Sequence, residues 1–270
     1  MIPAQFEYEM ADSVSQALEL LAEHGEDAKL LAGGHSLLPM MKLRLATPAM
    51  LIDIARIGEL AGIRADGDEL VIGATTRYAD IVSSGLVRAE VPLLAHAAAQ
   101  VGDPQIRHRG TIGGSLAHSD PAADLPMTLV ALGGSLEITG PSGVRTVPAD
   151  EFFTGFFESV LEPDELLTAV RVPRGGSVPW GYQKFVRRAN DWAIVGVAAY
   201  DGRVALASMG VTPIRALGVE EALRAGAPAA EAALRAVEGT SAGSDFHADK
   251  SYREHLARVL TRRALEGKTG

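Results

Sequence analysis

The stretch TIGGSLAHSDPAAD, residues 111–124, and the earlier, similar stretch AGGHS, residues 32–36, decide how the rest of this chain is interpreted. Each places a pair of glycines directly after an apolar run. Glycine has no Cβ, so the backbone can turn sharply there and present its N–H groups to an anionic ligand. Two such turns predict two clamps on one phosphorylated cofactor.

The first turn follows residues 28–31, an apolar run that predicts a buried strand. Ser36 adds a hydroxyl that can donate to a phosphate oxygen. Residues 37–45, LLPMMKLRL, predict a helix that starts at the turn, and Pro39 is tolerated there because the first helical turn lacks internal N–H partners. On these residues alone an ordinary turn is the commoner interpretation, because glycine is the default turn residue.

The second turn repeats the combination of glycine and hydroxyl groups and is followed by two aspartates. A carboxylate beside a phosphate site is favourable when it accepts hydrogen bonds from sugar hydroxyls, so Asp124 is predicted to bind a ribose or ribityl group. Asp120 is equally well explained as the cap of a helix that begins near Ala122. The turn itself offers Thr111, Gly113, Gly114 and Ser115.

Several common sites are missing from the sequence. No G-x-G-x-x-G opens a helix with an acidic residue about twenty positions later, and no Walker A motif occurs, so the cofactor is not expected on a Rossmann unit. The seven histidines show no metal-binding spacing, and we predict no metal site.

The composition limits the possible partners. Acidic residues outnumber basic residues by 34 to 25 and aromatic residues make up only 5%, which argues against a nucleic-acid partner. No run of about 18 apolar residues predicts a membrane span, and the start MIPAQFEYEM does not resemble a signal peptide, so we expect a cytoplasmic protein.

The chain contains no cysteine. This excludes disulfides, thiolate nucleophiles and any iron-sulfur cluster held by this chain alone. If the protein takes part in redox chemistry, an organic cofactor must carry the electrons here, and any cluster must lie on a partner.

The order of predicted elements indicates an α+β protein. The Pro-Arg-Gly-Gly run at residues 173–176 is typical of a linker and predicts a boundary between residues 1–174 and residues 175–270. The first region is predicted to hold two α/β subdomains divided near residues 55–65. The second is predicted to be a small α+β domain, with a three-stranded sheet at residues 182–186, 193–200 and 203–211, followed by helices at 218–224, 229–237 and 252–265.

Four segments together resemble one known family, and they occur in the same order as in that family. They are AGGHSLLPMMKLRLATPAMLIDI, TIGGSLAHSDPAADLP, KFVRRANDWAIVG and GVTPIRA. The chain is similar, over nearly its whole length, to the FAD-binding medium subunit of the molybdenum hydroxylases, which include aerobic carbon monoxide dehydrogenase and xanthine dehydrogenase. The resemblance implies a two-part FAD-binding domain of the PCMH-like type followed by a C-terminal flavoprotein domain.

The resemblance also implies roles for individual residues. In the family, the first turn wraps the FAD pyrophosphate and the second is a further pyrophosphate and flavin loop. Asp124 matches an acidic residue at the ribose of the adenine half, Lys184 matches a lysine close to the flavin ring, and Trp192 lies in a loop that approaches the isoalloxazine, where the family varies the residue type. The two turns contribute Ala32, Gly33, Gly34, His35, Ser36 and Leu37, and Thr111, Gly113, Gly114 and Ser115, where many relatives have Asn at the last position.

A division of labour between subunits follows from the same resemblance. A large subunit with molybdenum cofactor oxidises a substrate, a small subunit with iron-sulfur clusters relays electrons, and this chain holds the terminal FAD. A dimer of such heterotrimers is expected. No side chain of this subunit is expected to act as acid, base or nucleophile, because the cofactor carries the chemistry.

Two alternatives stay open on the sequence. One is an independent flavin oxidase of the vanillyl-alcohol-oxidase type, which has a similar Gly-Gly-His loop but needs a substrate pocket of its own. The other is a non-catalytic nucleotide-binding or assembly subunit. The sequence leaves open both the substrate of the molybdenum partner and the final electron acceptor.

Overall fold

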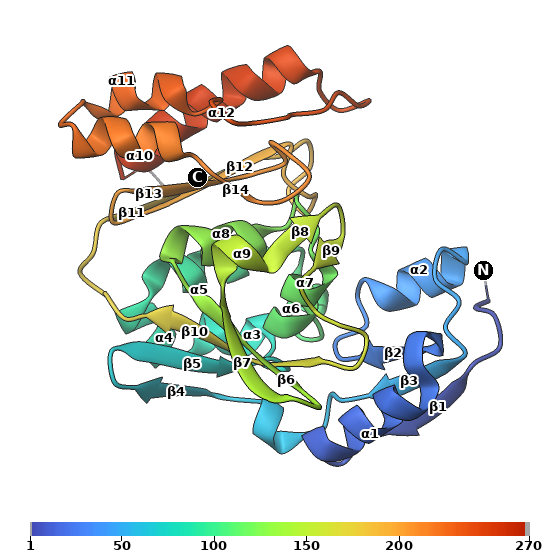
Figure 1. The fold of residues 1–270 in the computed structure, drawn as a ribbon. Helices are drawn as coiled ribbons and strands as arrows, with labels where there is room; N and C mark the ends of the chain where they lie inside the picture. The colour runs from blue at the N-terminus through green and yellow to red at the C-terminus, as the bar shows by residue number, and fades with distance from the viewer. Residues whose placement is uncertain (1, 268–270) are drawn as a thin grey trace.

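The computed structural model of the chain describes residues 2–267 and contains three main β-sheets (Figure 1). The N-terminal residues form the first sheet, whose three strands are parallel and lie in the order β1-β3-β2. Helices α1 and α2 connect these strands. The elements are β1 (Glu7–Met10), α1 (Val14–His24), β2 (Ala28–Leu31), α2 (Leu37–Leu43) and β3 (Met50–Asp53).

Helix α1 is explained by its local sequence. The Ser13 side chain accepts a hydrogen bond from the N–H of Gln16, which caps the start of the helix. The helix ends at Gly25, whose φ of 54° suits glycine. Its buried residues Ala17, Leu20 and Leu21 lie three and four positions apart, so they form one face that packs in the core of the first sheet.

The second sheet has five antiparallel strands in the order β4-β5-β10-β6-β7. Strand β10 lies at its centre and returns to the sheet after seven helices have been formed. The strands are β4 (Ile63–Asp66), β5 (Glu69–Gly73), β6 (Ser135–Gly140), β7 (Gly143–Pro148) and β10 (Leu166–Pro173). A separate small hairpin consists of β8 (Phe153–Gly155) and β9 (Glu158–Ser159).

Helices cover one face of this second sheet and separate it from the C-terminal sheet (Figure 1). Helix α8 is buried along its whole length, which explains why its sequence DLPMTLVAL is almost entirely apolar. The helices are α3 (Tyr78–Ser83), α4 (Gly85–Glu90), α5 (Pro92–Ala99), α6 (Pro104–Arg107), α7 (Ile112–His118), α8 (Asp124–Leu132) and α9 (Ala149–Phe152).

The C-terminal sheet has four antiparallel strands in the order β11-β12-β13-β14. The C-terminal helices lie on its outer side and α8 lies on its inner side (Figure 1), so every residue of β12 is buried. The elements are β11 (Trp180–Phe185), β12 (Val195–Tyr200), β13 (Arg203–Ala207), β14 (Ile214–Arg215), α10 (Leu217–Arg224), α11 (Ala229–Ala232) and α12 (Lys250–Leu265). Short 3₁₀ segments occur at Gly25–Asp27, Gly58–Leu60 and Ala233–Arg235.

The predicted α+β class is confirmed, and the structure adds details that the sequence did not predict. The C-terminal sheet has a fourth strand, β14, which is only two residues long and therefore has no periodic pattern. The helix expected near Ala122 begins at Asp124 instead. Asp120 accepts a hydrogen bond from the N–H of Ala122 at 2.9 Å, but this bond closes a turn that precedes the helix.

Two kinds of feature are missing from the described part of the chain. No helix among residues 2–267 is long and apolar enough to span a membrane. In the same residues, no group of three or more His, Cys, Asp or Glu side chains is placed to hold a metal ion.

Candidate cofactor site

The two glycine turns lie against each other in the structure. A Cβ added to Gly33 would be 2.4 Å from the carbonyl oxygen of Arg109 and 2.9 Å from the Cα of Gly110. These neighbours are backbone atoms that directly precede the second turn. The N-terminal sheet region and the second sheet region therefore meet here backbone to backbone, at a distance that only glycine permits.

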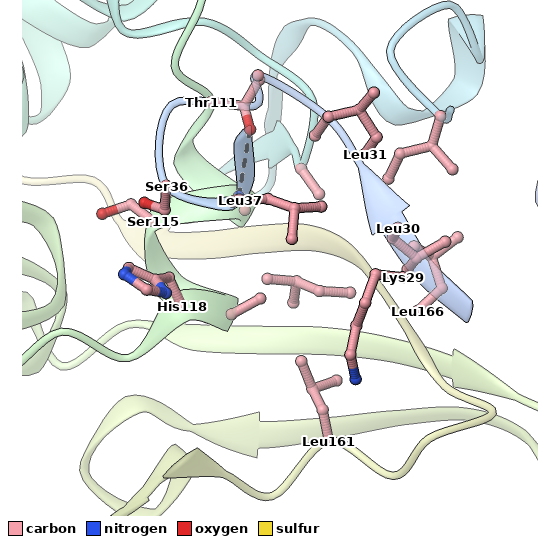
Figure 2. A pocket seen from close by; sticks show the side chains of 18 of the residues that line it. Lys29, Leu30, Leu31, Ser36, Leu37, Thr111, Ser115, His118, Leu161 and Leu166 are labelled. Carbon is pink, nitrogen blue, oxygen red and sulfur yellow. Dashed lines mark hydrogen bonds between the residues drawn. The ribbon is translucent and has the colours of Figure 1, made fainter. Parts of the chain in front are cut away.

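A cavity of about 820 Å³ opens at this contact. Its size falls within the range of small-molecule and cofactor pockets, about 300–1,000 Å³. In Figure 2, Ser36, Ser115 and His118 lie on one side of the cavity, and Lys29, Leu30, Leu161 and Leu166 lie on the other. The predicted residues on its wall are Ala32, Gly33, Gly34, His35, Ser36, Leu37, Thr111, Gly113, Gly114 and Ser115.

The first turn presents a run of unbonded backbone N–H groups. Within residues 2–267, no backbone or side-chain acceptor bonds the N–H groups of residues 33–37, and the first bond after the turn runs from the N–H of Leu38 to the carbonyl of Gly34. Gly34 has a φ of 75°, a left-handed conformation that allows successive N–H groups to point to one side. Five neighbouring donors beside a cavity suit an anionic group such as a phosphate.

The second turn differs from the first, because the N–H groups of residues 112–115 all have acceptors within the protein. The N–H of Gly113 donates to the Ala74 carbonyl at 2.8 Å, and the N–H of Gly114 donates to the Thr111 hydroxyl at 3.2 Å. The turn is in fact the capped start of α7. Its glycines are needed for close packing, because a Cβ on Gly113 would lie 2.6 Å from the Cβ of Ala74.

Three predicted site residues lie outside the lining of the cavity. Asp124 and Lys184 pair with each other at 2.9 Å between Oδ2 and Nζ, and their side chains are only 7% and 6% exposed. Trp192 lies between β11 and β12, is 64% exposed and does not line the cavity. The structure therefore does not bring these three side chains to the wall of the cavity that the two turns form.

The Asp124 carboxylate is bonded within the protein at both oxygens. The hydroxyl of Tyr182 donates to Oδ1, and Lys184 donates to Oδ2 and also to the carbonyl of Gln100 at 3.2 Å. Burial raises the pKa of Asp124, while the charge of Lys184 and the Tyr182 hydrogen bond act in the opposite direction. This cluster joins α8 and α5 to the first strand of the C-terminal sheet.

The structure adds Tyr78 to the cavity wall, a residue that the sequence did not single out. Its ring occupies the space beside Gly110, where an added Cβ would be 2.4 Å from Cε2. Burial is the main cause that raises the pKa of Tyr78 to about 12, and a hydrogen bond with Ser115 opposes this rise. The phenol therefore stays protonated at neutral pH. In the sequence, a tyrosine at the start of an amphipathic helix is typical of a core residue, so no pattern marked it.

His118 and Phe157 are two further wall residues that the sequence analysis missed. Their rings contact each other, with centroids 4.8 Å apart and planes at 45°. Burial lowers the pKa of His118, and the charge of Asp120 acts against this effect. His118 lies inside the quoted stretch 111–124, but a single histidine without metal spacing gave no signal for a role.

Comparison with known proteins identifies the family. Residues 4–175 match the family described as "FAD binding domain in molybdopterin dehydrogenase", and residues 180–267 match the "CO dehydrogenase flavoprotein C-terminal domain". The carbon monoxide dehydrogenase medium chain of Hydrogenophaga pseudoflava is 44% identical and aligns over 98% of this chain and 97% of its own length. A subunit of the 6-hydroxypseudooxynicotine dehydrogenase complex of Paenarthrobacter nicotinovorans is 38% identical over 98% of this chain and 95% of its own.

Solved structures agree with this match. Reconstituted CO dehydrogenase from Oligotropha carboxidovorans contains a chain that superposes with a TM-score of 0.95 at 38% identity, covering 99% of this chain and 98% of that one. Both the fold and the sequence therefore agree over almost the whole length. The chain belongs to the family of FAD-binding medium subunits of the molybdenum hydroxylases, which includes the carbon monoxide dehydrogenase medium chains.

Proposed function

We propose that this subunit holds FAD in the cavity between the two glycine turns and passes electrons from a partner's iron-sulfur clusters to an external acceptor. The single observation that carries the placement is the run of unbonded N–H groups at residues 33–37 beside the Gly33 contact. FAD, when bound, supplies the redox chemistry. The residues of this chain bind the cofactor, orient it and set its surroundings.

The proposed roles of the two turns differ. Residues 33–37 would donate backbone hydrogen bonds to the pyrophosphate, and the hydroxyl of Ser36 adds a side-chain donor. Thr111, Gly113 and Gly114 instead fix the position of α7, so that Ser115 lines the cavity. Ala32, His35 and Leu37 complete the first wall.

For Asp124, Lys184 and Trp192 a direct contact with FAD stays a prediction from the family resemblance. Because both oxygens of Asp124 are bonded within the protein, by Tyr182 and Lys184, we propose that Asp124 and Lys184 act on the cofactor mainly by fixing the C-terminal sheet against α8. The boundary near residues 174 and 175 also stays a proposal. The linker there is well packed, since the N–H of Gly175 donates to the carbonyl of Glu90 at 2.8 Å.

The hydroxyl of Tyr78 is expected to contribute to the affinity of the chain for FAD. Replacing Tyr78 with phenylalanine keeps the ring beside Gly110 and removes one donor from the wall, so the dissociation constant for FAD should rise about 2- to 12-fold. Quenching of flavin fluorescence on titration measures this constant. Tyr200→Phe is the matched control, because the hydroxyl of Tyr200 contacts Gly175 and does not line the cavity. Equal dissociation constants for FAD in Tyr78→Phe and wild type would contradict a contact between the Tyr78 hydroxyl and the cofactor.

The partners are proposed from the relatives. The described relatives are subunits of multi-subunit dehydrogenases, and a chain without cysteine needs its clusters on another polypeptide. We propose a small iron-sulfur subunit, a large subunit with molybdenum cofactor, and a dimer of these heterotrimers in the cytoplasm. The relatives are named for different substrates, so the substrate is expected to depend on the large subunit.

Purification with the partner chains co-expressed tests this function. The expected product is a yellow complex that contains molybdenum, iron and a cysteine-rich small chain, in equal numbers of the three subunits. The isolated chain reconstituted with FAD should not reduce its flavin with any organic substrate of the complex. An isolated chain that does so would support an independent oxidase, and a chain that binds no FAD would support a non-catalytic assembly subunit.

A further inference from the structure

Phe157 has an unusual backbone conformation at the tip of the β8–β9 hairpin. Its φ is 59°, in the left-handed region that bulky side chains rarely adopt because the Cβ approaches the following carbonyl. The turn lies between Gly155 and Glu158, which pair across the hairpin. Glycine is the residue usually found with a positive φ in such a turn. A phenylalanine here costs stability, so its side chain must be favoured for another reason.

Burial in the core is not that reason. Phe157 is 43% exposed and the neighbouring Phe156 is 62% exposed. Their rings pack edge to face, with centroids 4.5 Å apart and an interplanar angle of 77°. The other ring contact of Phe157 is with His118 of α7, and both Phe157 and His118 line the cavity between the glycine turns. The strained turn therefore places an aromatic ring on the cavity wall.

The position of this ring pair along the cavity is informative. Figure 2 places His118 on the same side as Ser36 and Ser115, away from Lys29, Leu30 and Leu166 on the other side. The ring pair of His118 and Phe157 therefore lines the same cavity as residues 33–37, with their unbonded N–H groups. A dinucleotide cofactor carries a planar ring system at each end of its pyrophosphate, and His118 and Phe157 offer aromatic side chains to one of them within the same cavity.

We propose that Phe157 and His118 form an aromatic wall that binds one heteroaromatic ring system of the cofactor, either the isoalloxazine or the adenine. This inference rests on the proposed function, because it takes FAD as the occupant of the cavity. The neutral form of the His118 imidazole, favoured by its burial, is compatible with a ring contact of this kind. Aromatic pairs at 4.5–7 Å are favourable beyond the area they bury.

Substitutions at Phe157 can separate the effect of its ring on FAD binding from the effect of its strained backbone on stability. Phe157→Gly removes the ring and also relieves the left-handed strain, so the melting temperature of the cofactor-free chain should stay within about 2 °C of wild type or rise. Its dissociation constant for FAD should nevertheless rise about tenfold. Phe157→Tyr keeps a ring and should bind FAD within about twofold of wild type. Phe157→Leu loses the ring, so it should bind FAD as weakly as Phe157→Gly.

Asp201→Gly is the matched control. Asp201 also has a positive φ, 48°, in the turn between β12 and β13, and it does not line the cavity. The dissociation constant of Asp201→Gly for FAD should equal that of wild type. Titrations with FMN and with ADP then identify the ring system, because only the ligand that carries the bound ring should lose affinity in Phe157→Gly.

The outcomes distinguish this inference from the proposed function. Unchanged affinity of Phe157→Gly for FAD would overturn the aromatic wall while leaving the FAD site intact. A fall of several degrees in melting temperature together with equal losses of FAD affinity in Phe157→Gly and Phe157→Tyr would also overturn it, because it would show a purely structural role. Failure of the wild-type chain to bind FAD would overturn the proposed function itself.

Discussion

Replacing Lys184 with methionine is expected to lower the free energy of unfolding by about 3–5 kcal/mol at pH 7. Lys184 and Asp124 form an ion pair of 2.9 Å, and their side chains are 6% and 7% exposed. Removing the ammonium group leaves the Asp124 carboxylate buried, and among residues 2–267 only the Tyr182 hydroxyl then donates to it from a side chain. Denaturant unfolding followed by circular dichroism measures the difference.

The pH dependence of this variant follows from the pKa of Asp124. Burial already raises that pKa, and without the opposing charge of Lys184 it should rise further. The folded variant then favours the protonated carboxyl, so its stability is greatest below about pH 4, the pKa in the unfolded chain, and falls as pH rises through the folded pKa. The stability difference from wild type should therefore increase between acidic and neutral pH.

Two further variants make this prediction specific. Lys250→Met removes one partner of the exposed pair with Glu254, 3.7 Å apart, and should cost less than about 1 kcal/mol. Adding Asp124→Asn to Lys184→Met removes the uncompensated charge and keeps an acceptor for Tyr182, so it should recover more than half of the loss. A loss below about 1 kcal/mol for Lys184→Met at pH 7 would contradict a buried ionic contact.

Replacing Gly33 with alanine is expected to weaken FAD binding by roughly tenfold to 100-fold. The added Cβ meets backbone atoms of Arg109 and Gly110 at 2.4 and 2.9 Å, and these atoms cannot move aside as a flexible side chain can. The two turns must separate, and overpacking of this kind costs about 1–3 kcal/mol. The dissociation constant of FAD from a fluorescence titration gives the loss directly.

Gly85→Ala is the matched control for this substitution. Gly85 also lacks a positive φ, and an added Cβ would meet no atom within 4 Å. The control should retain the affinity and the melting temperature of wild type. If Gly33→Ala bound FAD as tightly as Gly85→Ala, the backbone contact between the two turns would not matter for the cofactor.

Local chemistry in the sequence explains many elements. The Ser13 cap and Gly25 stop define α1, and the run of apolar residues before Gly33 defines β2. The dipeptide Asp201-Gly202 marks the turn between β12 and β13. These features depend on residues that are close together in the chain, so a single sequence contains the information.

The parts of the site that sequence reasoning missed depend on residues far apart in the chain. The N–H of Gly113 donates to the carbonyl of Ala74. The carboxylate of Asp124 accepts a hydrogen bond from Lys184, which lies 60 residues later in the chain. Neither partner can be recognised before the fold is known. A glycine pair therefore predicted a sharp turn correctly, but it could not show whether the N–H groups of that turn were free.

Amide hydrogen–deuterium exchange, compared for the chain with and without saturating FAD, tests the central claim most directly. The N–H groups of residues 33–37 are unbonded in the protein, whereas those of residues 112–115 already have protein acceptors. FAD is therefore expected to slow exchange strongly at 33–37 and much less at 112–115. Unchanged exchange at 33–37, with protection by FAD confined to 112–115 or to the C-terminal sheet, would contradict the proposed site.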